Sequence, residues 1–281
     1  MLEVGGVALR YGDGTQALAG VDLTIPRGLY GLLGPNGAGK SSLMRVIATL
    51  QRPDAGSVTL DGIDALAEPR AVRARLGYLP QEFGVYPGVS AAALLDQFCV
   101  LKGVTQRTER TETVERLLRL VNLWEARDRA VASFSGGMRQ RFGIAQALIG
   151  DPTLVVVDEP TAGLDPEERG RFHEILLSLG ARAVVLVSTH IVEDVASLCR
   201  RLAVLAAGRI MAEGEPDVLT ARLAGRVWEG PARAALPPAT LRMRLAAGRR
   251  LARVLDEPPS GYQQVPPELE DAYFAALQGR L

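Results

Sequence analysis

The chain has 281 residues, enough to build a hydrophobic core in one large domain or two small ones. Its 32 basic and 32 acidic side chains cancel, so the charge balance gives no reason to expect nucleic acid as a partner. No apolar run approaches the roughly 20 residues of a membrane span, and the first residues lack the pattern of a signal peptide. Cys99 and Cys199 stand alone beside apolar residues, which favours buried free thiols. These features predict a cytoplasmic protein.

The first quarter of the chain predicts an antiparallel sheet followed by a strand–loop–helix unit. Residues 2–9 and 18–25 are strand-like and flank a turn at residues 12–14, and residues 57–60 are a third such stretch, closed by Asp61-Gly62. Residues 28–33 form a short apolar run typical of a buried strand, and residues 41–50 have helical apolar spacing.

The middle of the chain alternates helices and strands. After a short strand at 76–79, residues 83–150 predict a mostly helical subdomain, with helices over 90–102 and 109–121. Three later runs are apolar at every position, which suits parallel strands buried on both faces. They cover residues 154–157, 183–187 and 202–205. Asp165 and Pro166 predict the start of another helix, which Gly180 ends. This alternation predicts an α/β domain over residues 1–225.

The composition changes in the last part of the chain, and residues 226–281 predict a small C-terminal α+β extension. Residues 222–253 hold eight arginines and one acid, whereas residues 256–271 hold five acids and no base. We expect the arginines to form a solvated face, with contact to lipid headgroups as the alternative. Residues 268–278 predict a short amphipathic helix.

A glycine-rich run between the strand at 28–33 and the following helix predicts a phosphate site. It matches the P-loop pattern G-x-x-x-x-G-K-[ST] and reads Gly34-Pro35-Asn36-Gly37-Ala38-Gly39-Lys40-Ser41-Ser42. Lys40 is one of only two lysines, against thirty arginines. Backbone N–H groups at a helix N-terminus favour anions. The lysine of this pattern reaches the β- and γ-phosphates, and the hydroxyl of Ser41 binds Mg²⁺. The predicted ligand is a nucleoside triphosphate.

Two carboxylates follow the apolar run at 154–157. Asp158 and Glu159 are consecutive, and successive strand residues face opposite ways, so the two acids cannot do the same job. We expect Asp158 to hold Mg²⁺ or its waters, since this cation prefers oxygen ligands. Glu159 would then orient or deprotonate the attacking water.

A second glycine-rich element is found at Ser135-Gly136-Gly137, before a predicted helix that continues to residue 149. Ser135 can cap this helix, and the two glycines leave its N–H groups bare. Because the P-loop already serves one triphosphate, this second anion site is either a simple cap or half of a site on another subunit.

In order along the chain, these motifs resemble the ATP-binding subunit of an ABC transporter over roughly residues 1–225. The family's glutamine loop, signature, D-loop and switch histidine appear as well. They are found at residues 78–81, 134–138, 162–165 and 188–190.

The resemblance implies a head-to-tail dimer that binds two ATP molecules, each between one P-loop and the partner's residues 135–137. Tyr11 stands where the family places a ring that stacks on adenine. Gln81 would reach Mg²⁺ or the attacking water, and His190 would contact the γ-phosphate. Met138 replaces the glutamine that often ends the signature, which puts that hydrogen bond in doubt.

Residues 76–102, 226–229 and 269–273 further resemble the ABC-2 type exporters, which use a separate membrane permease. The resemblance implies that Phe83, Val85 and Tyr86 lie near the groove for that permease; ordinary loop packing is the alternative. The expected location is therefore the inner face of the cell membrane, and a homodimer is favoured over a heterodimer. The cargo stays open.

Two other functions compete with transport. One is an ABC protein that acts on DNA or ribosomes. Such proteins usually carry two nucleotide domains, a long coiled coil or zinc-binding cysteines, whereas this sequence has one P-loop, no long heptad run and no cysteine cluster. The other is an ATPase that only regulates a partner, which the sequence does not exclude. The chain's other histidine, His173, lies in the middle of a predicted helix beside Glu174, where we expect a surface position.

Overall fold

The structure is a computed structural model and describes residues 1–84, 86–161, 164–232 and 239–281. Its strands are β1 (Leu2–Arg10), β2 (Gln16–Ile25), β3 (Gly28–Leu33), β4 (Ala55–Leu60), β5 (Ile63–Asp64), β6 (Leu76–Leu79), β7 (Leu154–Asp158), β8 (Val184–Thr189), β9 (Arg201–Ala206), β10 (Arg209–Gly214), β11 (Val227–Pro231), β12 (Thr240–Ala246), β13 (Arg249–Leu255) and β14 (Gln263–Gln264). Its α-helices are α1 (Lys40–Ile47), α2 (Pro69–Ala74), α3 (Ala91–Leu101), α4 (Arg107–Leu120), α5 (Gly136–Ala147), α6 (Pro166–Gly180), α7 (Val192–Leu198), α8 (Pro216–Ala221) and α9 (Leu269–Leu277).

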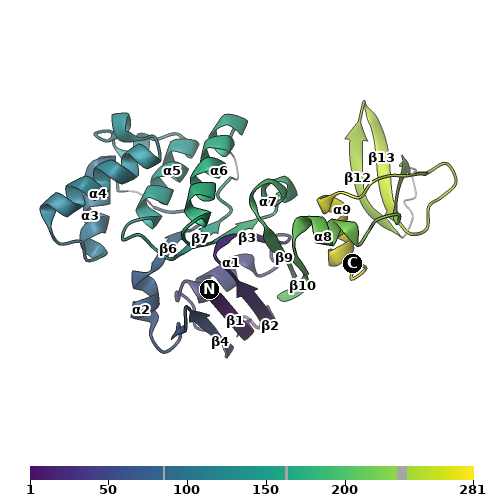
Figure 1. Cartoon of the computed structure of the whole chain (residues 1–281), viewed down its shortest axis with the longest axis horizontal. Helices are drawn as coiled ribbons and strands as arrows, with labels where there is room; N and C mark the ends of the chain where they lie inside the picture. The colour runs from purple at the N-terminus through teal and green to yellow at the C-terminus, as the bar shows by residue number, and fades with distance from the viewer. Residues whose placement is uncertain (85, 162–163, 233–238) are drawn as a thin grey trace.

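The central sheet has the order β10-β9-β3-β8-β7-β6 and is seen in the middle of Figure 1. Its strands from β9 to β6 are parallel, and β10 pairs antiparallel at the edge. The apolar runs predicted as parallel strands are therefore confirmed. Because parallel strands end at the same edge, the segments that follow β3, β7 and β8 come together there.

This sheet separates two hydrophobic cores, because side chains alternate between its faces. In β7, Val155 and Val157 belong to the core shared with the helical part of the chain. Leu154 and Val156, in the same strand, pack into the core shared with the N-terminal sheet. Burial on both faces explains why the run is apolar at every position.

The N-terminal sheet is antiparallel, as predicted, and has the order β2-β1-β4-β5. Helix α1 contacts both β2 and β7, and its residues Leu43, Met44 and Ile47 are fully buried. It ends at Ile47 rather than at the predicted Leu50, because Thr49 adopts a left-handed backbone with φ of 59°. Helix α1 is therefore packed between two sheets, with its N-terminus at the carboxyl end of β3.

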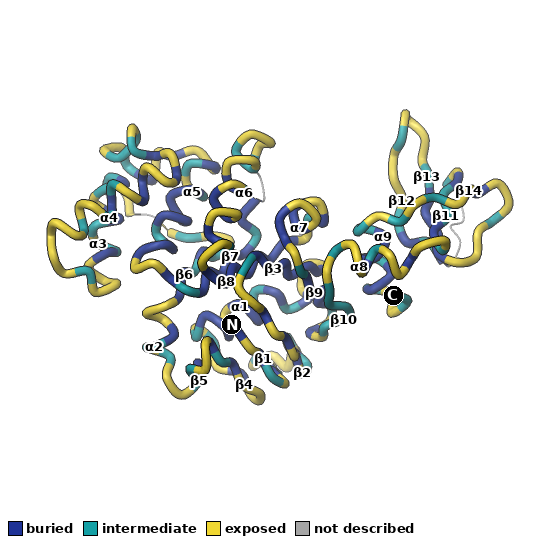
Figure 2. Tube along the Cα trace, viewed as in Figure 1, coloured by how far each residue is buried: buried dark blue, intermediate teal, exposed yellow. Residues whose placement is uncertain are grey.

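Helices α3, α4 and α5 form the predicted helical layer, which lies apart from the N-terminal sheet in Figure 1. Ser90 caps α3 by accepting a hydrogen bond from the N–H of Ala93 at 3.3 Å. Figure 2 shows buried and exposed residues alternating along α3 and α4, whereas most of α5 is buried. Among the described residues, no helix is both long and apolar enough to span a membrane, and Cys99 and Cys199 are buried free thiols as predicted.

The C-terminal residues form a separate antiparallel sheet of order β12-β13-β11-β14 together with helix α9. Figure 1 shows this sheet projecting away from the central sheet, with α9 between the two. Helix α9 contacts α7, α8, β9 and β10 as well as β12. The predicted helix at 268–278 is present, and Glu268 and Asp271 cap it reciprocally.

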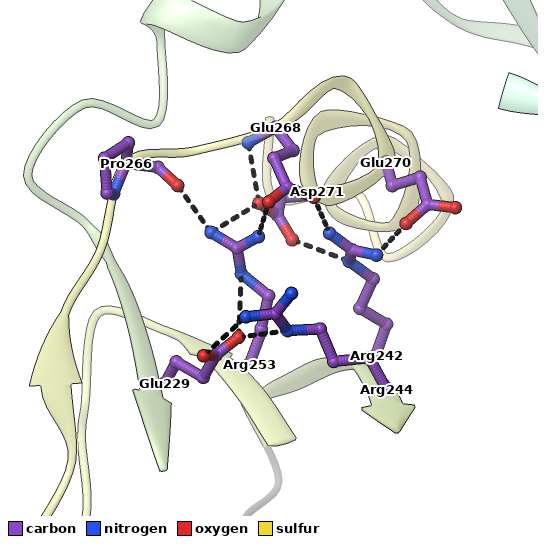
Figure 3. Close-up of polar contacts among 8 residues, drawn as sticks. All are labelled: Glu229, Arg242, Arg244, Arg253, Pro266, Glu268, Glu270 and Asp271. Atoms are coloured by element: carbon purple, nitrogen blue, oxygen red, sulfur yellow. Dashed lines mark hydrogen bonds and ion pairs between the residues drawn. The ribbon is translucent and has the colours of Figure 1, made fainter. Parts of the chain in front are cut away.

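An ionic network joins this sheet to α9 and contradicts the predicted solvated face for two of its arginines. Arg253, which is 2% exposed, lies 2.7 Å from Glu268 Oε1 and 3.3 Å from Asp271 Oδ2 (Figure 3). Arg242 pairs with both of these acids and with Glu270. The prediction failed because arginines of β12 and β13 face acids that follow them along the chain, and each neutralises the other.

Replacing Arg253 by alanine is expected to cost about 1–3 kcal/mol of unfolding free energy, because the fully buried Asp271 loses one of the two arginines that face it. Urea denaturation followed by tryptophan fluorescence measures the loss, since Trp228 lies on the neighbouring strand β11. Arg249→Ala, at an exposed position of the same strand, is the matched control. Equal and small losses in both variants would show that the buried network does not stabilise the sheet.

Candidate functional site

The glycine-rich run lies between the end of β3 and the start of α1, as predicted. Gly39 has a φ of +105°, and a Cβ at this position would lie 2.4 Å from the carbonyl oxygen of Ala17. Only glycine fits this backbone. Helix α1 has no side-chain cap, so its first N–H groups stay available to an anion.

Lys40 is 5% exposed and lies over the loop that precedes it. Its ammonium donates hydrogen bonds to the carbonyls of Gly34 at 2.8 Å and Pro35 at 3.2 Å. The same nitrogen lies 3.5 Å from Oε1 of Glu159. The lysine of the P-loop therefore faces the second of the two acids that follow the apolar run at 154–157.

A pocket of about 500 Å³ surrounds this lysine. It is lined by Tyr11, Thr15, Gln16, Ala17, Asn36, Gly37, Ala38, Gly39, Lys40, Ser41, Ser42, Gln81 and Glu159. The structure thus brings Tyr11 and Gln81 to the P-loop from distant parts of the chain. Residues 15–17, at the start of β2, were not predicted, since nothing in their residue types marks a binding role.

Tyr11 lies on one wall of this pocket, directly after β1. Its hydroxyl is 2.9 Å from Oγ of Ser42, the residue after the predicted magnesium ligand Ser41. The contact fixes the aromatic ring beside the P-loop, where the ring can offer a stacking surface to a base.

The two acids after β7 have separate environments. Asp158 is 3% exposed and accepts a hydrogen bond from the hydroxyl of Ser188 on the neighbouring strand β8. Glu159 has a left-handed backbone with φ of 47°, and its N–H donates to the carbonyl of Ser188 at 3.1 Å. Such a conformation is strained for a residue other than glycine and clusters at functional sites.

The Glu159 carboxylate lies between two other predicted site residues. Its Oε2 is 3.1 Å from Nδ1 of His190, and its Oε1 faces Lys40. His190 follows β8, the strand next to β7, which explains why side chains 31 residues apart meet. The side chain of Glu159 is 11% exposed and that of His190 is 47% exposed, so this pair is open toward solvent on the histidine side.

The second glycine-rich element is exposed at the start of α5. Ser135 caps the helix by accepting a hydrogen bond from the N–H of Met138 at 3.2 Å. Ser135 and Gly136 are exposed, whereas Gly137 packs against Glu168 so closely that a Cβ would lie 2.6 Å from its carboxyl carbon. Glu168 in turn pairs with Arg141 of α5, and burial lowers the pKa of that guanidinium.

Residues 135–137 do not line the pocket around Lys40. Gly136 lines another pocket of about 430 Å³ with Gln81, Glu82, Phe83, Arg139, Gln140 and Leu164. Gln81 therefore contributes to both pockets. Met138 is partly buried against the helical core, so its thioether packs within the chain.

Three predicted residues fall outside the described part of the chain: Val85, and Ala162 and Gly163 of the predicted D-loop. The predicted surface position of His173 is wrong. Its side chain is 17% exposed, and its Nε2 lies 3.3 Å from Oδ1 of Asp194. Burial lowers the pKa of His173, and Asp194 opposes this shift. No local sequence pattern indicates this contact, because the partner lies 21 positions away on another helix.

Comparison with known proteins identifies the family. The family described as ABC transporter matches residues 18–162. The daunorubicin/doxorubicin resistance ATP-binding protein DrrA of Streptomyces peucetius is 39% identical over 231 residues, which cover 80% of this chain and 68% of DrrA. The Nod factor export ATP-binding protein I of Burkholderia lata is 36% identical over 279 residues, covering 98% of this chain and 88% of that protein.

Solved structures agree with the sequence comparison. A dimeric ATP-binding cassette in a post-hydrolysis state, bound to ADP and Pi, is 26% identical to this chain and superposes with a TM-score of 0.70. The match covers 76% of this chain and 98% of the cassette chain. An ATP-binding subunit of an ABC transporter is 27% identical with a TM-score of 0.71, and the match covers 80% of this chain and 93% of that subunit. These similarities confirm the predicted P-loop NTPase fold. The chain therefore belongs to the ABC transporter family, as an ATP-binding subunit with ATPase activity.

Proposed function

We propose that two copies of this chain form a head-to-tail dimer with two ATP molecules at the interface. The observation that supports this most strongly is the separation of the two glycine-rich elements within one chain. The P-loop lines one pocket, whereas Ser135 and Gly136 are exposed at the start of α5 and do not line that pocket. An ATP held by residues 34–42 of one copy would meet residues 135–137 of the other.

Within each site, different residues bind the nucleotide and activate the attacking water. Lys40 and the backbone of the P-loop bind the phosphates, and Tyr11 stacks on the adenine. Glu159 orients or deprotonates the attacking water, and His190 contacts the γ-phosphate. Two contacts support this assignment: Glu159 lies 3.5 Å from the Lys40 ammonium, and His190 lies 3.1 Å from Glu159.

Mg²⁺ fits the oxygen donors that the chain offers. Ser41 and Gln81 line the pocket, and Asp158 lies at the carboxyl end of β7, directly before Glu159, which also lines the pocket. Their hydroxyl, amide and carboxylate oxygens are the hard ligands that this cation prefers. Mg²⁺ held there would neutralise charge on the phosphates during transfer.

We further propose that the dimer drives export through a separate permease at the inner face of the membrane, with no role for nucleic acid. The name of one relative, the Nod factor export ATP-binding protein I, supports export. A groove of about 480 Å³ is a suitable docking surface, since Leu50 and Leu101, which are 60% and 80% exposed, line it with Tyr78. Phe83 lines the pocket next to Gly136 instead, and Tyr86 is 63% exposed.

Leu101→Glu is expected to weaken binding to vesicles that contain the permease at least tenfold, because it places a charge in an apolar contact. Val218→Glu is the matched control, since Val218 is an exposed apolar residue on α8. Cosedimentation with vesicles, with and without the permease, measures binding. Equal binding of both variants would contradict docking at this groove, and binding that ignores the permease would contradict a permease partner.

A further inference from the structure

A buried polar cluster joins the segments that follow Glu159 and His190. Its centre is the carboxylate of Asp194, a residue that is 4% exposed. Oδ2 of Asp194 accepts a hydrogen bond from Oγ1 of Thr161 at 2.5 Å, and Thr161 is 2% exposed. The bond connects residues 33 positions apart in the sequence.

The Thr161–Asp194 hydrogen bond connects the two segments that carry Glu159 and His190. Thr161 follows Glu159 by two residues, and Asp194 follows His190 by four, in the first turn of α7. Strands β7 and β8 are hydrogen-bonded neighbours, so they already align these two segments at their starts. The Thr161–Asp194 hydrogen bond links the same two segments a second time, at positions that follow Glu159 and His190 in the chain.

Helix α6 brings two basic side chains close to the Asp194 carboxylate. Nε2 of His173 lies 3.3 Å, and Nη1 of Arg169 3.7 Å, from Oδ1 of Asp194. These two residues are four positions apart, so they share one face of α6. A buried carboxylate needs such partners, because an uncompensated charge in the interior is costly.

We propose that Asp194 and Thr161 are positioning residues for ATP hydrolysis. They hold the Glu159–His190 pair at its 3.1 Å spacing without touching the nucleotide themselves. The inference rests on the roles proposed for Glu159 and His190. The P-loop follows β3 and Lys40 begins α1, and neither of these elements supplies a residue of the cluster. Loosening the cluster should therefore slow the chemical step and leave ATP binding intact.

Four single variants test this inference by steady-state ATPase kinetics. Thr161→Val exchanges the hydroxyl for a methyl group of similar size, and Asp194→Asn keeps an acceptor oxygen but removes the charge. Both are expected to lower kcat about 10-fold or more, with KM for ATP changed less than about twofold, since small misplacements of reacting groups are costly. Thr161→Ser, which keeps the hydroxyl, should restore most of kcat. Glu193→Gln, at the exposed neighbour of Asp194, should match the wild type.

A purely structural role would give a different result. If Thr161→Val lowers the melting temperature but keeps kcat, or raises KM alone, the cluster does not position the site and the inference is overturned. Thr161→Val decides the question even if Asp194→Asn fails to fold. Glu159→Gln measured in parallel separates the two proposals. If it is inactive while Thr161→Val is fully active, only this inference fails; if it hydrolyses ATP normally, the assignment of Glu159 itself fails.

Discussion

Replacing Glu159 by glutamine is expected to lower the rate of ATP hydrolysis by about two to four orders of magnitude, the usual contribution of a general base. Glutamine has nearly the same shape but cannot accept a proton from the attacking water. ATP affinity should change little, because Lys40 and the P-loop backbone remain. Phosphate release under saturating MgATP measures the rate, and equilibrium binding of a fluorescent ATP analogue measures the affinity.

Glu174→Gln is the control for this experiment, since Glu174 is an exposed glutamate on α6. It should hydrolyse ATP at the wild-type rate. A Glu159→Gln protein with the wild-type rate would remove Glu159 from the hydrolytic step. The left-handed backbone and the contact with His190 would then need another explanation.

Replacing Lys40 by alanine is expected to weaken ATP binding roughly 10- to 100-fold, which corresponds to losing charged hydrogen bonds worth about 1.5–3 kcal/mol. The ammonium already lies against the P-loop carbonyls of Gly34 and Pro35, within reach of an anion in the same pocket. Hydrolysis should fall as well, because Lys40 is expected to contact the β- and γ-phosphates. Isothermal titration with ATP measures the affinity.

The chain offers a matched control in its other lysine. Lys102 donates hydrogen bonds to the carbonyls of Leu76 at 2.7 Å and Arg73 at 3.2 Å, outside the P-loop pocket. Lys102→Ala should therefore keep the wild-type affinity for ATP. Unchanged affinity in Lys40→Ala would count against the P-loop as the phosphate site.

Much of the fold follows from local sequence patterns. Residues 154–157 and 202–205 are apolar at every position, and the structure buries both runs inside the central sheet. The caps Ser90 and Asp165 begin α3 and α6, where their side chains accept hydrogen bonds from the first turn. These signals are local, since each depends on residues within one element.

The C-terminal sheet was harder to predict, because its order depends on contacts between distant residues. The arginines of β12 and β13 predicted a solvated face, yet Arg253 is buried against Asp271 of α9. The charge of each segment alone suggested exposure. Only the pairing of a basic sheet with an acidic helix makes burial possible.

In the candidate site, too, local motifs were predictable and contacts between distant residues were not. The P-loop, Asp158 and Glu159 were visible as motifs, and the structure brings Glu159 to Lys40 and His190 to Glu159. The wall formed by residues 15–17 and the cluster around Asp194 were not foreseen. A hydroxyl, a histidine and a carboxylate spread over three segments carry no spacing signal, so only the fold reveals that they meet.

The central claim is that two copies of this chain build each ATP site together. Light scattering on the purified Glu159→Gln protein, with and without MgATP, tests it most directly. Because this variant should bind ATP without hydrolysing it, we expect MgATP to convert a monomer of 30.0 kDa into a species of twice that mass. MgADP should leave it monomeric. A protein that binds ATP and yet stays monomeric at every concentration tested would contradict the claim.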